Sequence, residues 1–271
     1  MTGAKQSARK IRMKTVLIIF LFGALLSCRS KPATTDCLNN DDITVINLGG
    51  INCFLLRSAS GFILIDNAVP QKRDNIEAGI LAAGYKPEDL QLVILTHGDY
   101  DHVSNSTYFR DKYNVKIAMH NDDVGMVENC DMTWNRTKEN EYYALKFRMI
   151  SLLSIFFKTG DCETFSPDLI IDESFDLSEY GSTAKIVCLP GHSKGSIGVL
   201  TEDGDLICGD LIYNIFKPEF LYINDLPDAK DSIERLKTMN IRIVYPGHGN
   251  PFEFDRFIHK YYDRKFSKMK S

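Results

Sequence analysis

The sequence lacks a long hydrophobic segment, and this absence limits how the protein can meet a membrane. The apolar run at residues 16–26 has eleven residues, whereas a membrane-spanning helix needs about 20. Basic residues precede this run and Ser27-Cys28 follows it, which is typical of an export signal. We therefore expect residues 1–27 to be a signal peptide that directs the chain out of the cytoplasm.

The end of the apolar run predicts how the chain is processed after export. Leu25-Leu26-Ser27-Cys28 resembles a bacterial lipobox, in which the cysteine becomes the lipid-modified first residue of the mature chain. This resemblance implies a cell-envelope lipoprotein that meets the membrane through a lipid on Cys28, with residues 28–41 as a polar linker. An ordinary cleaved signal, giving a periplasmic or secreted protein, is the alternative.

Acidic residues outnumber basic residues in the expected mature chain. Removal of residues 1–27 takes away five of the 32 lysines and arginines and none of the 36 acidic residues, which leaves a formal charge of about −9. Nucleic-acid phosphates require a basic face. The composition therefore argues against nucleic acid as a partner, and we expect a small-molecule substrate instead. It does not indicate an oligomeric state.

Closely spaced cysteines are also absent. None of the seven cysteines forms a Cys-x-x-Cys pair, which is the spacing of many structural zinc sites. Cys188 and Cys208 lie in apolar runs, and we expect them to be small buried residues. An oxidising compartment permits disulfides. Cys130 and Cys162, which flank a segment without a recognisable motif, are the candidate pair.

Short apolar runs separated by turn residues indicate an α/β protein. Strands and helices occur in two comparable halves of one domain, residues 42–271. Strands are expected at residues 43–48, 52–57, 62–65, 92–95, 115–119, 169–171, 174–177, 184–189, 196–200, 205–209 and 241–245, and helices at 72–84, 103–113 and 228–239.

Residues 121–170 interrupt this order. The segment begins with polar residues, and its apolar residues at 142–157 occur at helical density. We expect a helical insertion here. Its apolar face would either cover the functional site as a lid or pack on the sheet.

The most informative stretch is residues 92–102. Its apolar start predicts a buried strand, and Thr96-His97-Gly98 marks where the chain leaves the sheet. Four potential metal ligands follow within six residues: His97, Asp99, Asp101 and His102. Histidine together with carboxylate is the ligand set of zinc and of harder first-row ions. We therefore predict a metal site at the end of this strand.

This stretch resembles the signature of the metallo-β-lactamase-fold hydrolases, whose usual form is His-x-His-x-Asp-His. Three later segments resemble the remaining motifs of that family in the same order: residues 189–193 (LPGHS), 207–210 (ICGD) and 245–249 (YPGHG). The resemblance covers about residues 43–255. It implies a four-layer αββα sandwich, in which two sheets pack face to face with helices outside.

The resemblance also implies a set of seven ligands and a reaction. Two divalent ions would share a hydroxide, which would cleave an ester, thioester, lactone or related bond. Zinc is the expected metal, and Asp101 and Asp210 are the expected catalytic residues. His97, Asp99 and His192 would hold one ion, Asp101, His102 and His248 would hold the other, and Asp210 would bridge them.

One residue departs from the family pattern. Asp99 stands where the family usually has a second histidine, and its added negative charge favours harder ions. Iron and manganese are therefore alternatives to zinc, and the change argues against a true β-lactamase. An iron-dependent oxidoreductase of the same fold and a non-catalytic metal-binding lipoprotein are the alternative functions.

Several polar residues outside the motifs carry weaker expectations. The two remaining histidines, His120 and His259, are expected to be ordinary histidines. Asp66 would either brace the ligand stretch, as the resemblance implies, or serve as a turn residue. Lys194 would be a solvated turn lysine or meet an anionic substrate, and Tyr213 and Tyr222 are candidate pocket residues.

Overall fold

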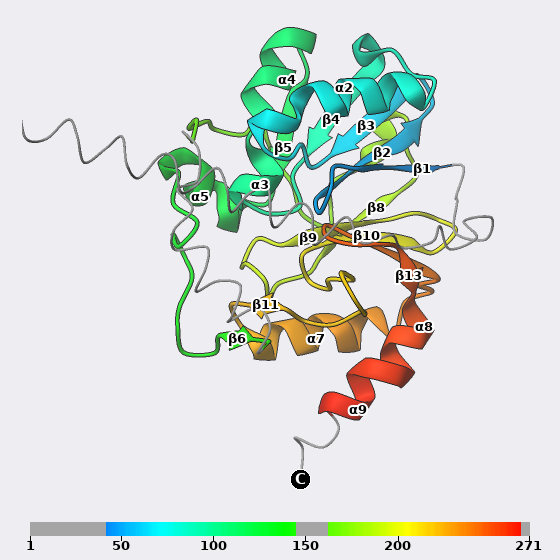
Figure 1. Ribbon diagram of the computed structural model, residues 1–271. Helices are drawn as coiled ribbons and strands as arrows, with labels where there is room; N and C mark the ends of the chain where they lie inside the picture. Colours follow the sequence, from blue (N-terminus) through cyan, green and yellow to red (C-terminus); the bar gives the residue numbers. More distant parts are fainter. Residues whose placement is uncertain (1–41, 145–161, 267–271) are drawn as a thin grey trace, which may run out of the picture.

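The computed structural model describes residues 42–144 and 162–266, which form two β-sheets packed face to face with helices on both outer faces (Figure 1). The predicted α/β four-layer αββα sandwich is confirmed. The expected signal peptide, Cys28 and the linker lie outside the described residues, as does most of the apolar part of the expected insertion. None of the helices described has the length and apolar character needed to cross a membrane.

The first sheet has the strand order β1-β2-β3-β4-β5-β7. β1 to β3 pair as antiparallel neighbours, whereas β3, β4, β5 and β7 run parallel, so the C-terminal ends of these last strands meet at one edge. Its strands are β1 (Ile43–Asn47), β2 (Asn52–Ser58), β3 (Gly61–Ile65), β4 (Leu90–Ile94), β5 (Lys116–Met119) and β7 (Leu169–Ile170), and α2 (Arg73–Ala82), α3 (Tyr100–Val103) and α4 (Ser106–Tyr113) belong to the same half.

The second sheet has the order β13-β12-β10-β9-β8. β10 and β12 are parallel, so their C-terminal ends also lie at one edge. The helices of this half lie on the opposite side of the molecule from α2 and α4 (Figure 1). The elements are β8 (Lys185–Cys188), β9 (Ile197–Leu200), β10 (Asp205–Gly209), β12 (Ile243–Pro246), β13 (Phe252–Glu253), α7 (Leu226–Leu236), α8 (Phe254–Phe257), a π-helix (Ile258–Tyr262) and α9 (Asp263–Phe266).

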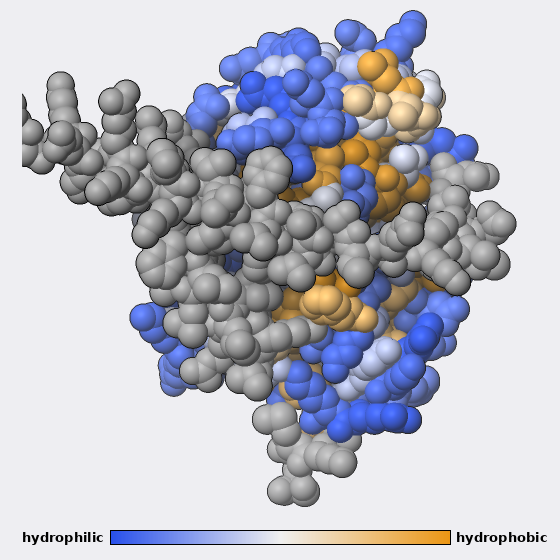
Figure 2. Space-filling view, viewed as in Figure 1, coloured by the Kyte–Doolittle hydropathy of each residue, from blue (hydrophilic) through white to orange (hydrophobic). Residues whose placement is uncertain are grey.

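Alternation along the strands divides the core into layers. In and just beyond β4, Leu92 and Ile94 pack between the two sheets, while Val93 and Leu95 pack toward the helices α2 and α4. Because successive side chains of a strand point to opposite faces, a continuous apolar run of this kind fits a strand buried on both sides. Figure 2 shows hydrophilic side chains over the outer layers and apolar side chains gathered nearer the middle.

The segment expected to be a helical insertion contains one short helix, α5 (Val124–Asn129), among its described residues. The expected helix at 142–157 is wrong at its start, because Tyr142–Tyr143 forms strand β6 and pairs with β11 (Tyr222–Ile223). Tyr143 stacks on Tyr222 with ring centroids 4.8 Å apart. The rest of that expected helix lies outside the described residues. The predicted Cys130–Cys162 disulfide is present.

One further expectation is confirmed only in part, and another is wrong. The helix expected at 103–113 is divided into α3 and α4, because the Asn105 side chain donates to the backbone oxygens of Asn67 and Val69 at 2.7 and 2.9 Å. The strand expected at 174–177 is a turn followed by a 3₁₀ helix at Leu177–Tyr180. Asp172 and Asp176 each accept the N–H two residues ahead, and such local bonds compete with strand pairing.

The disulfide should contribute measurable stability. Its two cysteines are 32 residues apart, and closing a loop of that length restricts the unfolded chain. We expect the double variant Cys130→Ser/Cys162→Ser to lose about 3–4 kcal/mol of unfolding free energy, measured by denaturant titration. Reductant should lower the wild type to the stability of the variant and leave the variant unchanged. A wild type that does not respond to reductant would contradict this prediction.

Candidate metal centre

Every predicted ligand lies just beyond the C-terminal end of a strand, where side chains from both sheets meet. The segment after β4, residues 96–102, which includes the start of α3, is called the ligand loop, and it carries His97, Asp99, Asp101 and His102. The remaining ligands follow three strands of the second sheet: His192 follows β8, Asp210 follows β10 and His248 follows β12. The structure brings all seven residues into two adjoining clusters. The first cluster contains the ligands predicted for one ion, and the second contains those predicted for the other ion together with Asp210.

The second cluster consists of Asp101, His102, Asp210 and His248. His102 Nε2 and His248 Nε2 are 3.3 Å apart. Asp210 places Oδ1 3.5 Å from His102 Nε2 and Oδ2 3.2 Å from His248 Nε2. Asp101 Oδ2 lies 3.4 Å from His248 Nε2 and 3.9 Å from His102 Nε2. The potential ligand atoms of the four residues therefore point toward a common centre.

Hydrogen bonds at the far side of each imidazole fix which nitrogen faces this centre. His102 Nδ1 donates to Asp66 Oδ2 at 2.7 Å, and His248 Nδ1 donates to the backbone oxygen of Gly50 at 2.6 Å. Each Nε2 therefore faces the centre beside two carboxylates, and each offers a lone pair to a metal ion once its ring is neutral. No described lysine or arginine forms an ion pair with Asp101 or Asp210. Such a set of acceptors fits a divalent metal ion.

The first cluster consists of His97, Asp99 and His192. Asp99 Oδ2 is 3.0 Å from His192 Nε2 and 3.8 Å from His97 Nε2. Thr96 Oγ lies 2.9 Å from His97 Nδ1, which leaves Nε2 as the inward atom, and this buried atom has no hydrogen-bond partner among the described residues. Ligand atoms of His97, His192 and Asp210 lie within 4.8 Å of one another.

Burial and neighbouring charges shift the titration of these groups. Burial, together with the charges of His102 and His192, lowers the pKa of His97 to about 3, so His97 is neutral and able to act as a ligand. Burial alone would lower the pKa of His102, but the carboxylates of Asp210 and Asp66 outweigh it and raise that pKa to about 9. Without a metal ion, His102 therefore keeps a proton on both ring nitrogens at neutral pH, and a divalent ion bound at Nε2 would replace one of these protons.

Asp66 braces the ligand loop, as the first of its two sequence interpretations held. Its buried carboxylate accepts the Thr96 N–H at Oδ1 and the Thr96 Oγ–H at Oδ2, both at 2.8 Å, in addition to the bond from His102. These bonds use both oxygens of Asp66. We therefore interpret Asp66 as a residue that orients the ligands rather than one that binds the metal.

Close packing around the second cluster requires glycine at position 247. A Cβ atom added there would lie 2.3 Å from Asp210 Oδ1 and 2.8 Å from His102 Cε1. Gly247 therefore allows the turn that carries His248 to approach the other ligands.

Asp123 is a buried residue that the sequence analysis missed. Its carboxylate accepts the N–H of Gly98 at 3.0 Å, the N–H of Gly195 at 2.8 Å and the hydroxyl of Ser193 at 2.6 Å. It thereby joins the ligand loop to the turn that carries His192. The local sequence shows only an acidic pair, which gives no sign of this contact.

Arg136 is a second residue that the sequence analysis missed. Its side chain is only 8% exposed, and Nη2 lies 2.8 Å from Asp99 Oδ1 and 3.3 Å from His192 Nε2. The guanidinium also lies over the ring of Tyr222, 5.2 Å from its centroid. A protein cation is therefore part of the first cluster.

The two tyrosines proposed as pocket residues both reach the clusters. Tyr213 stacks on His248 with ring centroids 5.4 Å apart, and its hydroxyl is 3.4 Å from His192 Nδ1. The backbone oxygen of Tyr222 accepts from His192 Nδ1 at 3.1 Å. Lys194 is exposed. His120 accepts a turn N–H and His259 is exposed, and neither belongs to either cluster.

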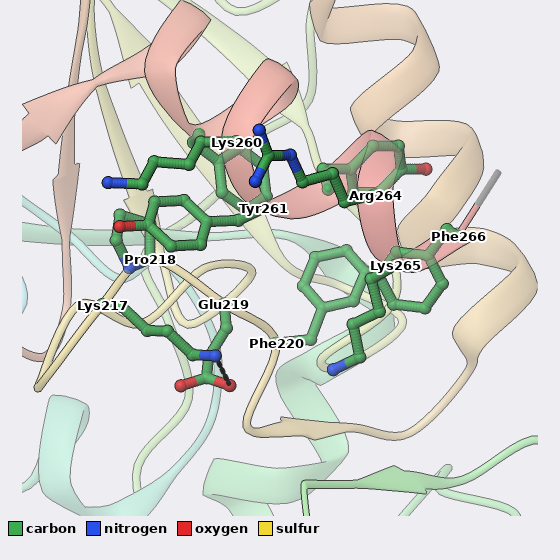
Figure 3. A pocket seen from close by; sticks show the side chains of 11 residues that line it. Lys217, Pro218, Glu219, Phe220, Lys260, Tyr261, Arg264, Lys265 and Phe266 are labelled. Atoms are coloured by element: carbon green, nitrogen blue, oxygen red, sulfur yellow. Dashed lines mark ion pairs between the residues drawn. The ribbon is translucent and has the colours of Figure 1, made fainter. Parts of the chain in front are cut away.

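A separate pocket of about 320 Å³ lies between the loop before β11 and the C-terminal helices (Figure 3). Basic and aromatic side chains surround it, including Lys217, Phe220, Lys260, Tyr261, Arg264 and Lys265. None of its lining residues belongs to either cluster, so this pocket is not the candidate metal centre.

The fold and the converging ligands agree with a comparison against protein families. The model of the metallo-β-lactamase superfamily matches residues 46–248. The chain belongs to the metallo-β-lactamase superfamily.

Relatives within this superfamily are distant. A beta-lactamase-like protein 2 homolog of Caenorhabditis elegans is 25% identical over 203 residues, which cover 74% of this chain and 57% of that protein. A probable metallo-hydrolase of Methanocaldococcus jannaschii is 28% identical over 169 residues, covering 60% of this chain and 71% of its own length. The human acyl-coenzyme A thioesterase MBLAC2 is 23% identical, with 76% of each chain covered. Together with the family, these relatives support a metal-dependent hydrolase in general.

Solved structures share the fold. A metallo-β-lactamase family protein of Thermus thermophilus superposes with a TM-score of 0.62 at 18% identity, covering 85% of this chain and 81% of that chain. The subclass B3 metallo-β-lactamase BJP-1 of Bradyrhizobium japonicum gives a TM-score of 0.57 at 19% identity, covering 85% and 92%. At this identity the likeness concerns the fold alone.

Removal of the Asp66 carboxylate should weaken metal binding. In Asp66→Ala, His102 loses the acceptor that orients its ring, and loss of such a partner typically costs 10–100-fold in metal affinity. We expect a decrease of roughly this size, measured by competition with a chromophoric chelator. Asp74→Ala, which removes an exposed carboxylate from α2, should bind metal as the wild type does. Equal affinities in the two variants would contradict a bracing role for Asp66.

Proposed function

We propose that this protein is a metal-dependent hydrolase that cleaves an ester, thioester, lactone or related bond of a small molecule, with zinc as its metal. The observation that carries the proposal is the second cluster, in which the Nε2 atoms of two imidazoles and two carboxylates converge and no described lysine or arginine is paired with them. The first cluster contains Arg136, so the proposal does not require the two ions that the family resemblance implies.

The second cluster has a solvent-facing side, which favours a catalytic over a structural role. The side chain of Asp101 is 38% exposed, whereas that of His102 is completely buried. A structural metal site closes its ligand shell, while a catalytic site keeps a position for water or substrate. When bound, a divalent ion supplies Lewis acidity, which activates water for attack and polarises the bond to be cleaved.

The protein's own residues orient the site and exclude water from its inner side. Asp210 directs one oxygen to each histidine, and Gly247 permits this close approach. Asp101 lies at the open side, where its carboxylate can accept a hydrogen bond from an entering water. The stacked Tyr213 ring covers His248. On the basis of this geometry, we assign catalytic roles to Asp101 and Asp210.

The lipobox and the disulfide support a location for this activity. We propose that the protein is exported and anchored to the membrane by a lipid on Cys28. The lipobox sequence is one argument, and the Cys130–Cys162 disulfide is an independent one, because such bonds persist mainly in oxidising compartments.

Metabolic labelling tests the anchor. Cells that express the full-length chain should incorporate labelled palmitate into the wild type and into Cys37→Ala, but not into Cys28→Ala. Label that persists in Cys28→Ala would refute the proposed site of lipid attachment.

Metal removal and one substitution test the hydrolytic function. We expect a chelator to abolish turnover of an ester, thioester and lactone panel and added zinc to restore it. Asp210→Ala should lower kcat/KM by more than roughly 100-fold, because the effect of losing a ligand exceeds that of losing a residue that supports one. Asp203→Ala, an exposed residue in the turn before β10, is the matched control.

The metal identity separates this proposal from its alternatives. Activity restored by zinc supports hydrolysis. Restoration by iron alone, with no hydrolysis of the panel, would support the oxidoreductase, and metal binding without turnover would support a non-catalytic lipoprotein. Full activity in Asp210→Ala would overturn the proposed mechanism.

A further inference from the structure

Arg136 reaches the first cluster from a loop that is held by a disulfide before this residue and by hydrogen bonds after it. The loop follows the disulfide-bonded Cys130, and the Asn224 side chain donates to the backbone oxygen of Thr137 at 2.6 Å. The N–H of Leu226 donates to the backbone oxygen of Asn140 at 3.1 Å. These bonds fix the chain on both sides of Arg136, so the buried guanidinium is held in place by its own loop.

The guanidinium contacts atoms that a metal ion would need. His192 Nδ1 donates to the backbone oxygen of Tyr222, which leaves Nε2 with a lone pair, and that lone pair faces Arg136 Nη2 at 3.3 Å. Arg136 Nη2 is also 2.8 Å from Asp99 Oδ1. Two of the three predicted ligands of the first ion are therefore already directed toward a positive charge.

The two clusters thus differ in charge. Asp99 carries the negative charge that distinguishes this ligand loop from the usual family pattern, and Arg136 supplies one positive charge beside it. A divalent ion in the first cluster would lie next to this buried guanidinium and be repelled by it. The second cluster has no such competitor among the described residues.

We propose that Arg136 takes the place of the first metal ion, so that each chain binds a single divalent ion, in the second cluster. The guanidinium neutralises Asp99, orients His192 and gives the first cluster a fixed positive charge. This inference rests on the proposed metal-dependent function, because it assumes that the second cluster binds an ion.

Metal stoichiometry tests the inference without reference to activity. The full-length protein is stripped of metal, equilibrated with excess zinc and passed over a desalting column, and metal per chain is measured by elemental analysis. We expect about one zinc per chain for the wild type and about two for Arg136→Ala, because the substitution frees Asp99 and His192. Lys138→Ala, an exposed residue of the same loop, should remain at about one.

Each outcome separates the inference from the proposed function. About two zinc per chain in the wild type would overturn the inference and leave the hydrolase proposal standing, whereas no bound zinc would overturn both. One zinc in both the wild type and Arg136→Ala would show that Arg136 is not the reason for the single ion. Arg136→Gln, which keeps a polar side chain without the charge, is the second variant if Arg136→Ala does not fold, and we expect it also to bind about two.

Discussion

Three hydrogen bonds converge on the buried carboxylate of Asp66, and the geometry of the metal centre depends on them. Thr96 donates twice and His102 once. Because the Thr96 hydroxyl donates to Asp66, its oxygen is left to accept from His97 Nδ1. A single carboxylate at the end of β3 therefore sets the inward nitrogen of one histidine in each cluster. Three donors offset the cost of burying this charge.

The geometry of the metal centre also depends on contacts between the two sheets. The Asn52 side chain, at the start of β2, donates to the backbone oxygens of Pro246 and Gly249, and Gly50 accepts from His248. A hairpin of the first sheet thus positions the last ligand of the second. The N–H of Ile197 donates in turn to the backbone oxygen of Thr96. Each half of the chain orients ligands that the other half carries.

Local patterns in the sequence were enough to predict much of this arrangement. The apolar run of β4, buried on both faces, predicted a central strand, and the polar residues directly after it predicted where the ligands gather. The family resemblance then indicated His192, Asp210 and His248, which the structure places beside them. Fold and candidate ligands were predictable because strand ends leave strong, short signals.

The remaining features depend on contacts between distant residues. Asp123 and Arg136 belong to a segment without a motif, and their roles arise only when that segment folds over the strand ends. The expected strand at 174–177 failed because aspartate side chains capture the backbone N–H groups locally. In the expected helix at 103–113, the side chain of Asn105 bonds to a distant part of the backbone. Periodicity carries no information about such bonds.

The division of the second cluster between the two sheets would link folding to metal supply. Asp101 and His102 follow a strand of the first sheet, while Asp210 and His248 follow strands of the second, so a bound ion would act as a cross-link between the halves. An ion that binds only the folded chain stabilises it by mass action, by about 2.7 kcal/mol at a free concentration 100 times the dissociation constant. With such an ion, the fraction of folded protein would depend on the metal concentration of the compartment in which the chain folds.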